Sequence, residues 1–296
     1  MEQLIALFHR NFPFCVREEA FVRTLLAQEK NVILSETDEN GNRIGAAVLE
    51  DNTILMLCVD PEYRRRGIGT QLLARAEETI RNGGYASIVI GAGAHYLMPG
   101  IPAVRPVVEE NLQPDTVYAG LEDHTDFFRK RGYMHRWDCN CFDMRMDLAD
   151  YAAVPFATEG ITYRWARPDD ISGITACTDR AHESFTKYYR NPALYREDNP
   201  KRVFIAEADR KIVGTLIVSF AAEGDGLGSV GCTAVDPDYQ GRKIASNLVI
   251  LGTGLLRDAG LSKAFLGYTY TGLDKLYGFA GYRICVYYFM AEKKFL

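Results

Sequence analysis

The sequence predicts an α/β protein that is built from one module used twice. Residues 31–50 and 202–220 each run as an apolar strand, a short polar turn and a second apolar strand opened by glycine, which is typical of a β-hairpin. The stretch DPEYRRRGIGTQLL, residues 60–73, returns as DPDYQGRKIASNLV at residues 236–249. The length of 296 residues exceeds the usual size of one domain, about 100–200 residues, so two domains are expected.

Each half continues past its hairpin through the same order of elements. A third strand, at 54–61 or 229–237, leads into the repeated stretch, and a helix with an apolar face follows it. A further strand, at 86–91 or 263–269, precedes a short helix and a last strand. The order β-β-β-α-β-α-β, preceded in each half by helical sequence, indicates an α/β domain.

The two domains are predicted at residues 1–150 and 161–296. The linker at 151–160 loses periodicity and collects small residues, one proline and one glycine. The first half carries a long insertion at about 92–125, where the second half has only about seven residues. A loop of that length in a compact domain is usually functional or a domain contact.

The composition limits the classes of function. With 47% hydrophobic and 25% charged residues, and no apolar run near the roughly 18 residues of a membrane span, we expect a cytoplasmic protein without a membrane partner. The net charge of −5 argues against a nucleic-acid partner. Seven cysteines without a CxxC pair favour neither a disulfide framework nor a metal site, and Cys139 and Cys141 are predicted to be buried, inert thiols. Monomer and homodimer both stay open.

The repeated stretch has the properties of an anion cradle. A strand, a turn and the first turn of a helix point unpaired N–H groups and the positive end of the helix dipole at one place. Gly67 and Gly69 let the main chain bend and let a ligand approach, and the arginines before them suit phosphate. The stretch lacks the GK[ST] of a P-loop, so a different phosphate-bearing ligand is indicated.

These residues resemble the acetyl-CoA motif of the GNAT superfamily of N-acetyltransferases, Q/R-x-x-G-x-G/A. Tyr-Arg-Arg-Arg-Gly-Ile-Gly follows a strand ending in Val-Asp-Pro, and the element order of both halves is similar to that of the family. The resemblance covers nearly the whole chain, as two tandem GNAT-like domains. It implies a mixed, mostly antiparallel sheet flanked by helices in each domain, acetyl-CoA as cosubstrate and the primary amine of a small molecule as acceptor.

The resemblance also implies where acetyl-CoA binds in each half. Its pyrophosphate would lie on the backbone amides of the motif, while the strand before the motif would hold the pantetheine arm and polarise the thioester carbonyl. The residues implied in the first half are Leu57, Cys58, Val59, Arg64, Arg65, Arg66, Gly67, Ile68, Gly69 and Thr70. Those implied in the second half are Thr233, Ala234, Val235, Gln240, Gly241, Arg242, Lys243, Ile244, Ala245 and Ser246.

The two halves differ at the residue that would protonate the leaving thiolate. In this family a tyrosine four residues before the glycine of a G-F or G-Y pair supplies that proton. Tyr277 occupies this position in the second half and Phe128 in the first, while Lys243 replaces a motif glycine in the second. We therefore expect Tyr277 to be the general acid and the C-terminal half to be catalytic. The alternatives are a catalytic N-terminal half, a CoA-binding sensor without catalysis, and a Tyr277 that packs on the sheet with its hydroxyl at the surface.

A general base is not evident. Where some family members carry a glutamate, this chain has Thr53 and Ser229, which cannot act as carboxylate bases. Glu183 lies in the helical region that lines the acceptor side in this family and is a candidate, with a solvated helix face as the alternative. His95 and Tyr96, in the insertion, could reach over a cleft or pack at a domain contact. The identity of the acceptor and the size of the acyl group stay open.

Overall fold

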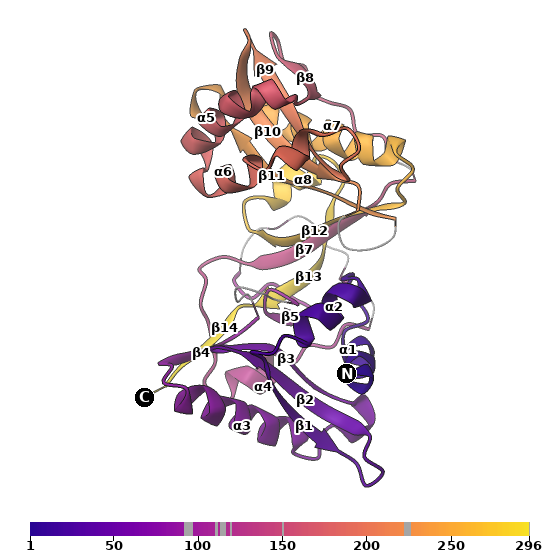
Figure 1. Ribbon diagram of the computed structural model, residues 1–296, viewed down its shortest axis with the longest axis vertical. Coiled ribbons are helices and arrows are strands. Elements are labelled where there is room, and N and C mark those ends of the chain that lie inside the picture. Colours follow the sequence, from indigo (N-terminus) through magenta and orange to yellow (C-terminus); the bar gives the residue numbers. More distant parts are fainter. Residues whose placement is uncertain are drawn as a thin grey trace. The chain divides into compact units, whose positions relative to one another are not determined.

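The computed structural model divides the chain into two compact units, which are described separately (Figure 1). The structure describes residues 1–91, 97–109, 112, 117–118, 120–149, 151–221 and 226–295. The first unit holds most of the N-terminal half together with residues 286–295. The second unit is formed mainly by Asp143–Cys285.

The first unit is a mixed sheet with helices on both faces. Its strands, in sheet order, are β1 (Val32–Thr37), β2 (Arg43–Glu50), β3 (Thr53–Val59), β4 (Ser87–Ile90), β14 (Ala291–Lys294) and β6 (Met134–His135). A short strand, β5 (Ile101–Ala103), pairs with the end of β13 (Arg283–Phe289). The helices are α1 (Glu2–Asn11), α2 (Glu19–Leu26), α3 (Ile68–Asn82), α4 (Thr125–Arg129) and the 3-10 turn η1 (Pro61–Tyr63).

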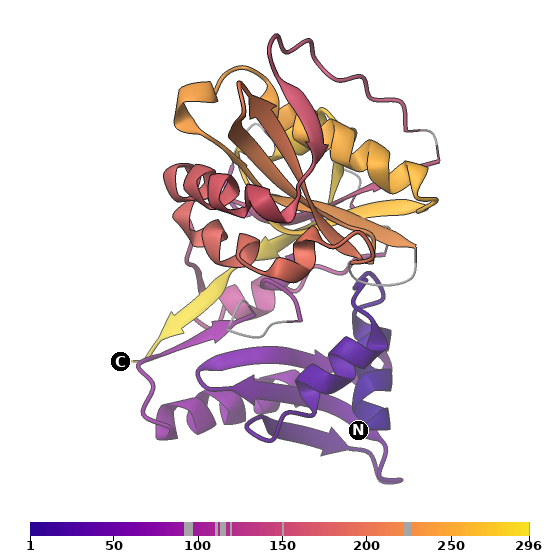
Figure 2. The same ribbon diagram turned by 45° about the horizontal axis from the view of Figure 1, so that its top comes forward.

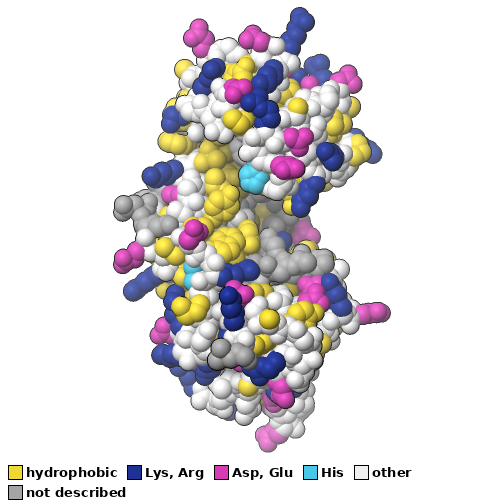
Figure 3. All heavy atoms as spheres, turned by 90° about the vertical axis from the view of Figure 1, so that its left-hand side faces the viewer, with side chains coloured by type: hydrophobic (Ala, Val, Ile, Leu, Met, Phe, Trp, Pro, Cys, Tyr) yellow, Lys and Arg dark blue, Asp and Glu magenta, His cyan; other side chains and the backbone are white. Residues whose placement is uncertain are grey.

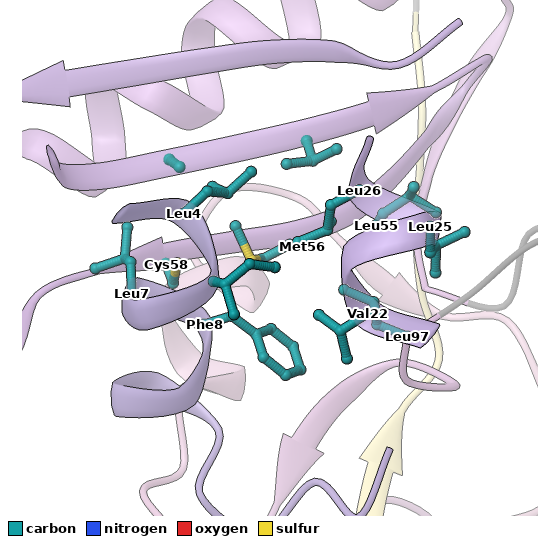
Figure 4. Close-up of a cluster of buried hydrophobic side chains, with 13 residues drawn as sticks. Leu4, Leu7, Phe8, Val22, Leu25, Leu26, Leu55, Met56, Cys58 and Leu97 are labelled. Carbon is teal, nitrogen blue, oxygen red and sulfur yellow. The ribbon is translucent and has the colours of Figure 1, made fainter. Parts of the chain in front are cut away.

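Alternate residues of β2 separate the two faces of this sheet. Ala46 and Val48 lie in a buried cluster with apolar side chains of α1 and α2, which Figure 4 shows in close-up. Ala47 and Leu49 lie in a second cluster with side chains of α3 and α4. The period of two along the strand therefore places one core on each side of the sheet.

The second unit repeats this plan. Its strands lie in the order β7 (Cys141–Asp147), β12 (Lys263–Tyr270), β11 (Leu227–Val235), β10 (Lys211–Ser219), β9 (Lys201–Ala208) and β8 (Thr162–Trp165), with β13 beside β7. The helices are α5 (Ile171–Ala181), α6 (Glu183–Tyr189), α7 (Ile244–Asp258), α8 (Asp274–Gly278) and the 3-10 turns η2 (Pro168–Asp170), η3 (Pro192–Tyr195) and η4 (Pro237–Tyr239). Side chains of α5 and α6 share a buried cluster with β9 and β10, and α7 packs on β10 and β11 (Figure 2). The predicted fold class, two tandem α/β domains with mostly antiparallel sheets, is confirmed.

The two units exchange their last strands. β7 begins in the first unit at Cys141 and continues into the second, while β14 near the end of the chain lies between β4 and β6 of the first. Lys293 of β14 donates hydrogen bonds to both carboxylate oxygens of Glu77 in α3, at 2.8 and 3.0 Å. The units thus divide the chain differently from the predicted ranges 1–150 and 161–296, because an apolar strand pattern shows that a strand is paired but not with which partner.

Other expectations concern surface charge, thiols and the membrane. Cys141 is buried as expected, whereas Cys139 is partly exposed. On the face drawn in Figure 3, basic and acidic side chains are interspersed over each unit. No helix within the described residues combines the length and the apolar character needed to cross a bilayer. Those residues also contain no cluster of His, Cys, Asp or Glu able to hold a metal ion.

Candidate functional site

The two repeated stretches follow the same main-chain course despite their different residues. Arg65 has φ of 63° and Gly67 has φ of 86°, while the matching Gly241 and Lys243 have φ of 78° and 62°. Each stretch therefore contains two left-handed residues, and the halves have exchanged which of them is glycine. The lysine at position 243 leaves the course of the loop unchanged.

Each stretch ends at the start of a fifteen-residue helix, α3 or α7, whose first N–H groups have no acceptor within the helix. A Cβ atom on Gly67 or Gly241 would have no atom within 4 Å, so both loops face open space. The described geometry therefore leaves two candidate anion cradles, one in each unit.

A buried aspartate fixes the turn before the second cradle. Asp236 accepts a hydrogen bond from the Asp238 main chain at 3.0 Å, and its other oxygen lies 2.9 Å from both Lys211 Nζ and Arg180 Nη1. Burial alone would raise the pKa of Asp236, but the Lys211 hydrogen bond and the two positive charges outweigh it and lower that pKa below its ordinary value. The carboxylate is therefore ionised at neutral pH and anchors the end of β11.

In each unit the strand before the cradle parts from its parallel neighbour. Pairing between β3 and β4, and between β11 and β12, covers only the first residues of the earlier strand within the described chain. The paired residues are Thr53↔Val89, Ile54↔Ile90, Leu227↔Lys263 and Gly228↔Ala264. Beyond these pairs the strands form a wedge beside Leu57–Val59 in one unit and Thr233–Val235 in the other.

The chain itself fills the wedge of the first unit. Leu97, from the insertion, is 2% exposed and packs in one cluster with Met56 and Cys58 of β3 (Figure 4). A Cβ atom on Gly91, at the end of β4, would lie 2.5 Å from the carbonyl oxygen of Met98. Residues 97–100 therefore run between the ends of β3 and β4, while His95 and Tyr96 lie outside the described residues.

Within the described residues, the wedge of the second unit is less filled than that of the first. In the pairing register, Gly231 lies opposite Ile217 of β10 as Met56 lies opposite Val48 of β2. Met56 is buried in one cluster with Leu97, whereas a Cβ atom on Gly231 would have no atom within 4 Å. Among the described residues, the second unit therefore has space alongside β11 that the first unit lacks.

A bulge in β11 borders this open wedge. The register with β10 shifts so that Cys232 and Thr233 stand opposite a single residue, and Cys232 has φ of 51°. The hydroxyl of Tyr189, a buried residue of α6, donates a 2.6 Å hydrogen bond to the Cys232 carbonyl. This contact was not predicted from the sequence, because a bulge leaves no clear pattern in a single strand.

Tyr277 lies against the bulge as a buried residue. It is 7% exposed, and its hydroxyl neighbours that of Thr233. Burial raises the pKa of Tyr277 to about 12, and the nearby Thr233 hydroxyl partly opposes that rise. Thr233 Oγ1 is itself buried and finds no partner of hydrogen-bond geometry among the described residues.

The first unit confirms that Phe128 takes the matching place. Phe128 packs edge-to-face on Tyr133 at 5.6 Å, as Tyr277 packs on Tyr282 at 6.0 Å. The first unit therefore offers no hydroxyl where the second presents that of Tyr277.

No base accompanies Tyr277 in the described structure. Glu183 is exposed in the first turn of α6, and within the described residues no hydrogen bond or ion pair joins it to Tyr277. Its neighbour His182 stacks on Phe185 at 4.0 Å and contacts Ser184 Oγ through Nδ1 at 2.8 Å. The geometry brings Tyr277 and Thr233 together but leaves Glu183 an unsupported candidate.

A strand wedge, a main-chain anion cradle and a buried tyrosine are the arrangement expected of an acyl-CoA-dependent transferase. Comparison with known proteins agrees: an acetyltransferase (GNAT) domain matches residues 28–135, and the acetyltransferase (GNAT) family matches residues 162–281. The chain belongs to the GNAT acetyltransferases, as two GNAT domains in tandem. Enzymes of this family use acetyl-CoA as cosubstrate.

Among curated proteins, mycothiol acetyltransferase of Cellulomonas flavigena is 26% identical over 77% of this chain. The chain spans 62% of the length of that relative.

Three solved structures share the fold. A GCN5-related N-acetyltransferase of Sphaerobacter thermophilus has a TM-score of 0.67 at 19% identity and covers 99% of this chain and 91% of its own. A tandem GNAT protein from the clavulanic acid biosynthesis pathway has a TM-score of 0.62 at 18% identity and covers 99% and 94%. A glucosamine N-acetyltransferase region of a fungal β-N-acetylglucosaminidase has a TM-score of 0.71 at 19% identity and covers 98% of this chain but 36% of its own.

Proposed function

We propose that the C-terminal domain transfers an acetyl group from acetyl-CoA to the primary amine of a small molecule in the cytoplasm, with Tyr277 as general acid. The observation that carries the proposal is the buried Tyr277 side chain beside the β11 bulge, in the unit whose wedge is less filled among the described residues. The first unit has Phe128 there and a wedge filled by residues 97–100. The 26% identity to a mycothiol acetyltransferase supports a small-molecule acceptor.

The residues of the second unit fit acetyl-CoA. The cradle at Gln240–Ser246 provides N–H groups for a pyrophosphate, and the strand end at Thr233–Val235 provides main-chain groups for the pantetheine arm. The buried, unpartnered Thr233 hydroxyl is a further group that a bound ligand could satisfy. The matching residues of the first cradle, Leu57–Val59 and Arg64–Thr70, could hold CoA without turnover.

Acetyl transfer from the thioester to an amine has three chemical requirements. The amine must be uncharged when its nitrogen forms the new bond to the carbonyl carbon, so it loses a proton through solvent. Main-chain N–H groups near the bulge would stabilise negative charge on the carbonyl oxygen. As the carbon–sulfur bond breaks, its electron pair stays on sulfur, which takes up the proton that Tyr277 Oη offers. The attacking nitrogen loses its second proton to solvent as the amide forms, and Tyr277 regains a proton from solvent.

A matched pair of variants tests which domain works. Gly67→Val and Gly241→Val each place a branched side chain at a left-handed position that faces open space, so their backbone strain should be similar. Thiol release from acetyl-CoA with a panel of small amines is expected to fall at least tenfold in Gly241→Val and to persist in Gly67→Val.

Two results would redirect the assignment. Loss of thiol release in Gly67→Val alone would move catalysis to the N-terminal domain. Tight CoA binding with no release from any amine would favour a sensor, and counting bound CoA per chain by calorimetry would show whether one or both cradles are used.

A further inference from the structure

Two exposed aromatic rings and one ammonium group gather at the mouth of the second cradle. The rings of Phe156 and Phe279 lie edge-to-face at 5.4 Å and are 36% and 47% exposed. Lys243 Nζ lies over both rings, 5.1 Å from the centre of Phe156 and 4.8 Å from that of Phe279. Large aromatic side chains at the surface forgo burial, so such a group suits contact with a planar ligand.

Phe156 is fixed in this place by the helix that begins at the cradle. Asn247, 1% exposed in α7, accepts a 2.8 Å hydrogen bond from the Phe156 N–H and donates a 2.9 Å bond to its carbonyl. The same amide donates to the Tyr163 hydroxyl at 3.1 Å. The segment predicted as a linker is thus fastened to α7, and its aromatic ring is presented beside Lys243.

The loop geometry gives no reason for a lysine at position 243. The first unit has Gly67 there, and a left-handed conformation is strained for a residue that carries a side chain. What the lysine adds is its ammonium group over the two rings. In the first unit this arrangement is absent among the described residues, since Gly67 has no side chain and Lys130 takes the place of Phe279.

We propose that Lys243, Phe156 and Phe279 form a subsite for the adenosine 3′-phosphate end of CoA. An aromatic ring stacks on the adenine, and the Lys243 ammonium forms an ion pair with the 3′-phosphate. In the described structure no carboxylate forms an ion pair with Lys243, so the ammonium is available to the phosphate. The inference rests on the proposed function, because it assumes that the cradle at Gln240–Ser246 holds the pyrophosphate of the same molecule.

The test is calorimetric titration with CoA, 3′-dephospho-CoA and 4′-phosphopantetheine, which share the arm and differ in the adenosine end. Phe156→Ala and Phe279→Ala are each expected to weaken CoA binding about fivefold or more and to leave phosphopantetheine binding unchanged. Lys243→Gly, which restores the residue best suited to the backbone, should remove the preference for CoA over 3′-dephospho-CoA. Phe21→Ala is the matched control, since Phe21 is an exposed ring with Arg17 over it at 5.0 Å in the other unit.

The outcomes separate the subsite from the proposed function. CoA binding that Gly241→Val abolishes but the two phenylalanine variants leave intact would overturn the subsite alone. Tighter CoA binding by Phe156→Ala would also overturn it, by showing that the ring obstructs the cradle. If Gly67→Val abolished CoA binding and Gly241→Val did not, CoA would bind in the first unit. Both the proposed function of the second unit and the subsite would then be wrong.

Discussion

Removing the Tyr277 hydroxyl is the sharpest test of the chemistry. The first unit already contains the equivalent of Tyr277→Phe, because Phe128 packs there on Tyr133 as Tyr277 packs on Tyr282. Thr233 Oγ1 forms no hydrogen bond with Tyr277, so the variant breaks none of the described bonds. We therefore expect a folded variant with nearly unchanged affinity for acetyl-CoA.

The size of the effect follows from the raised pKa of the buried Tyr277. A thiolate with a pKa of about 8.5, like that of cysteine, lies about 3.5 units below the pKa of about 12 of Tyr277, so complete proton transfer would be uphill by about 5 kcal/mol. The hydroxyl therefore acts by sharing its proton with the sulfur as the bond breaks. A hydrogen bond to a charged group contributes about 1.5–3 kcal/mol, which corresponds to a loss of roughly 10- to 150-fold in kcat.

The assay is thiol release at saturating acceptor, with acetyl-CoA affinity measured separately by calorimetry. Because the pKa of Tyr277 is about 12, the wild-type rate should show no alkaline limb from this residue between pH 8 and about 10. Burial also favours the neutral hydroxyl in the folded state, so its contribution to stability is present below the unfolded pKa of about 10 and lost as pH rises towards 12. An unchanged kcat in Tyr277→Phe would refute the role of the hydroxyl.

Three further changes have defined outcomes. Tyr189→Phe removes the hydrogen-bond donor to the Cys232 carbonyl and should lower kcat more than it raises KM for acetyl-CoA. A loss of stability with an unchanged kcat would show that this hydrogen bond is purely structural. Asp236→Asn should cost about 1–3 kcal/mol of unfolding free energy at pH 7. Since the folded pKa of Asp236 is lowered, that difference should shrink as pH falls below about 4, and urea titrations at several pH values check it. Lys293→Met should destabilise the first unit through loss of the bonds to Glu77, which hydrogen exchange in α3 would report as lower protection, and unchanged protection would contradict the contact's importance.

The sequence was sufficient for the order of elements and for the strand, turn and helix around each repeated stretch. Hairpins, wedge strands, cradle helices and short helices occur where hydrophobic periodicity and glycine positions predict them. The difference between Tyr277 and Phe128 could also be predicted, because each stands four residues before the glycine that follows its short helix. These features depend on local sequence, which a single chain displays directly.

Contacts between segments that are distant in the sequence could not be predicted. The wedge of the first unit is filled because Leu97 packs against β3, and Tyr189 contacts the Cys232 carbonyl because β11 has a bulge there. The position of Phe156 was hidden because its segment has the composition of a linker, and the residue that holds its main chain, Asn247, comes 91 positions later. Periodicity reports the face on which a residue lies, but not which distant residue it meets there.

The exchanged strands bear on how the chain folds as it is synthesised. β14 lies between β4 and β6, yet it is made after every strand of the second unit. At the time when β4 and β6 leave the ribosome, the strand that joins them does not exist, so the first sheet stays divided until synthesis is nearly complete. A ribosome-bound chain that stops before residue 291 should therefore hold a first domain that is open at that seam, and separate expression of residues 1–150 would leave the same gap.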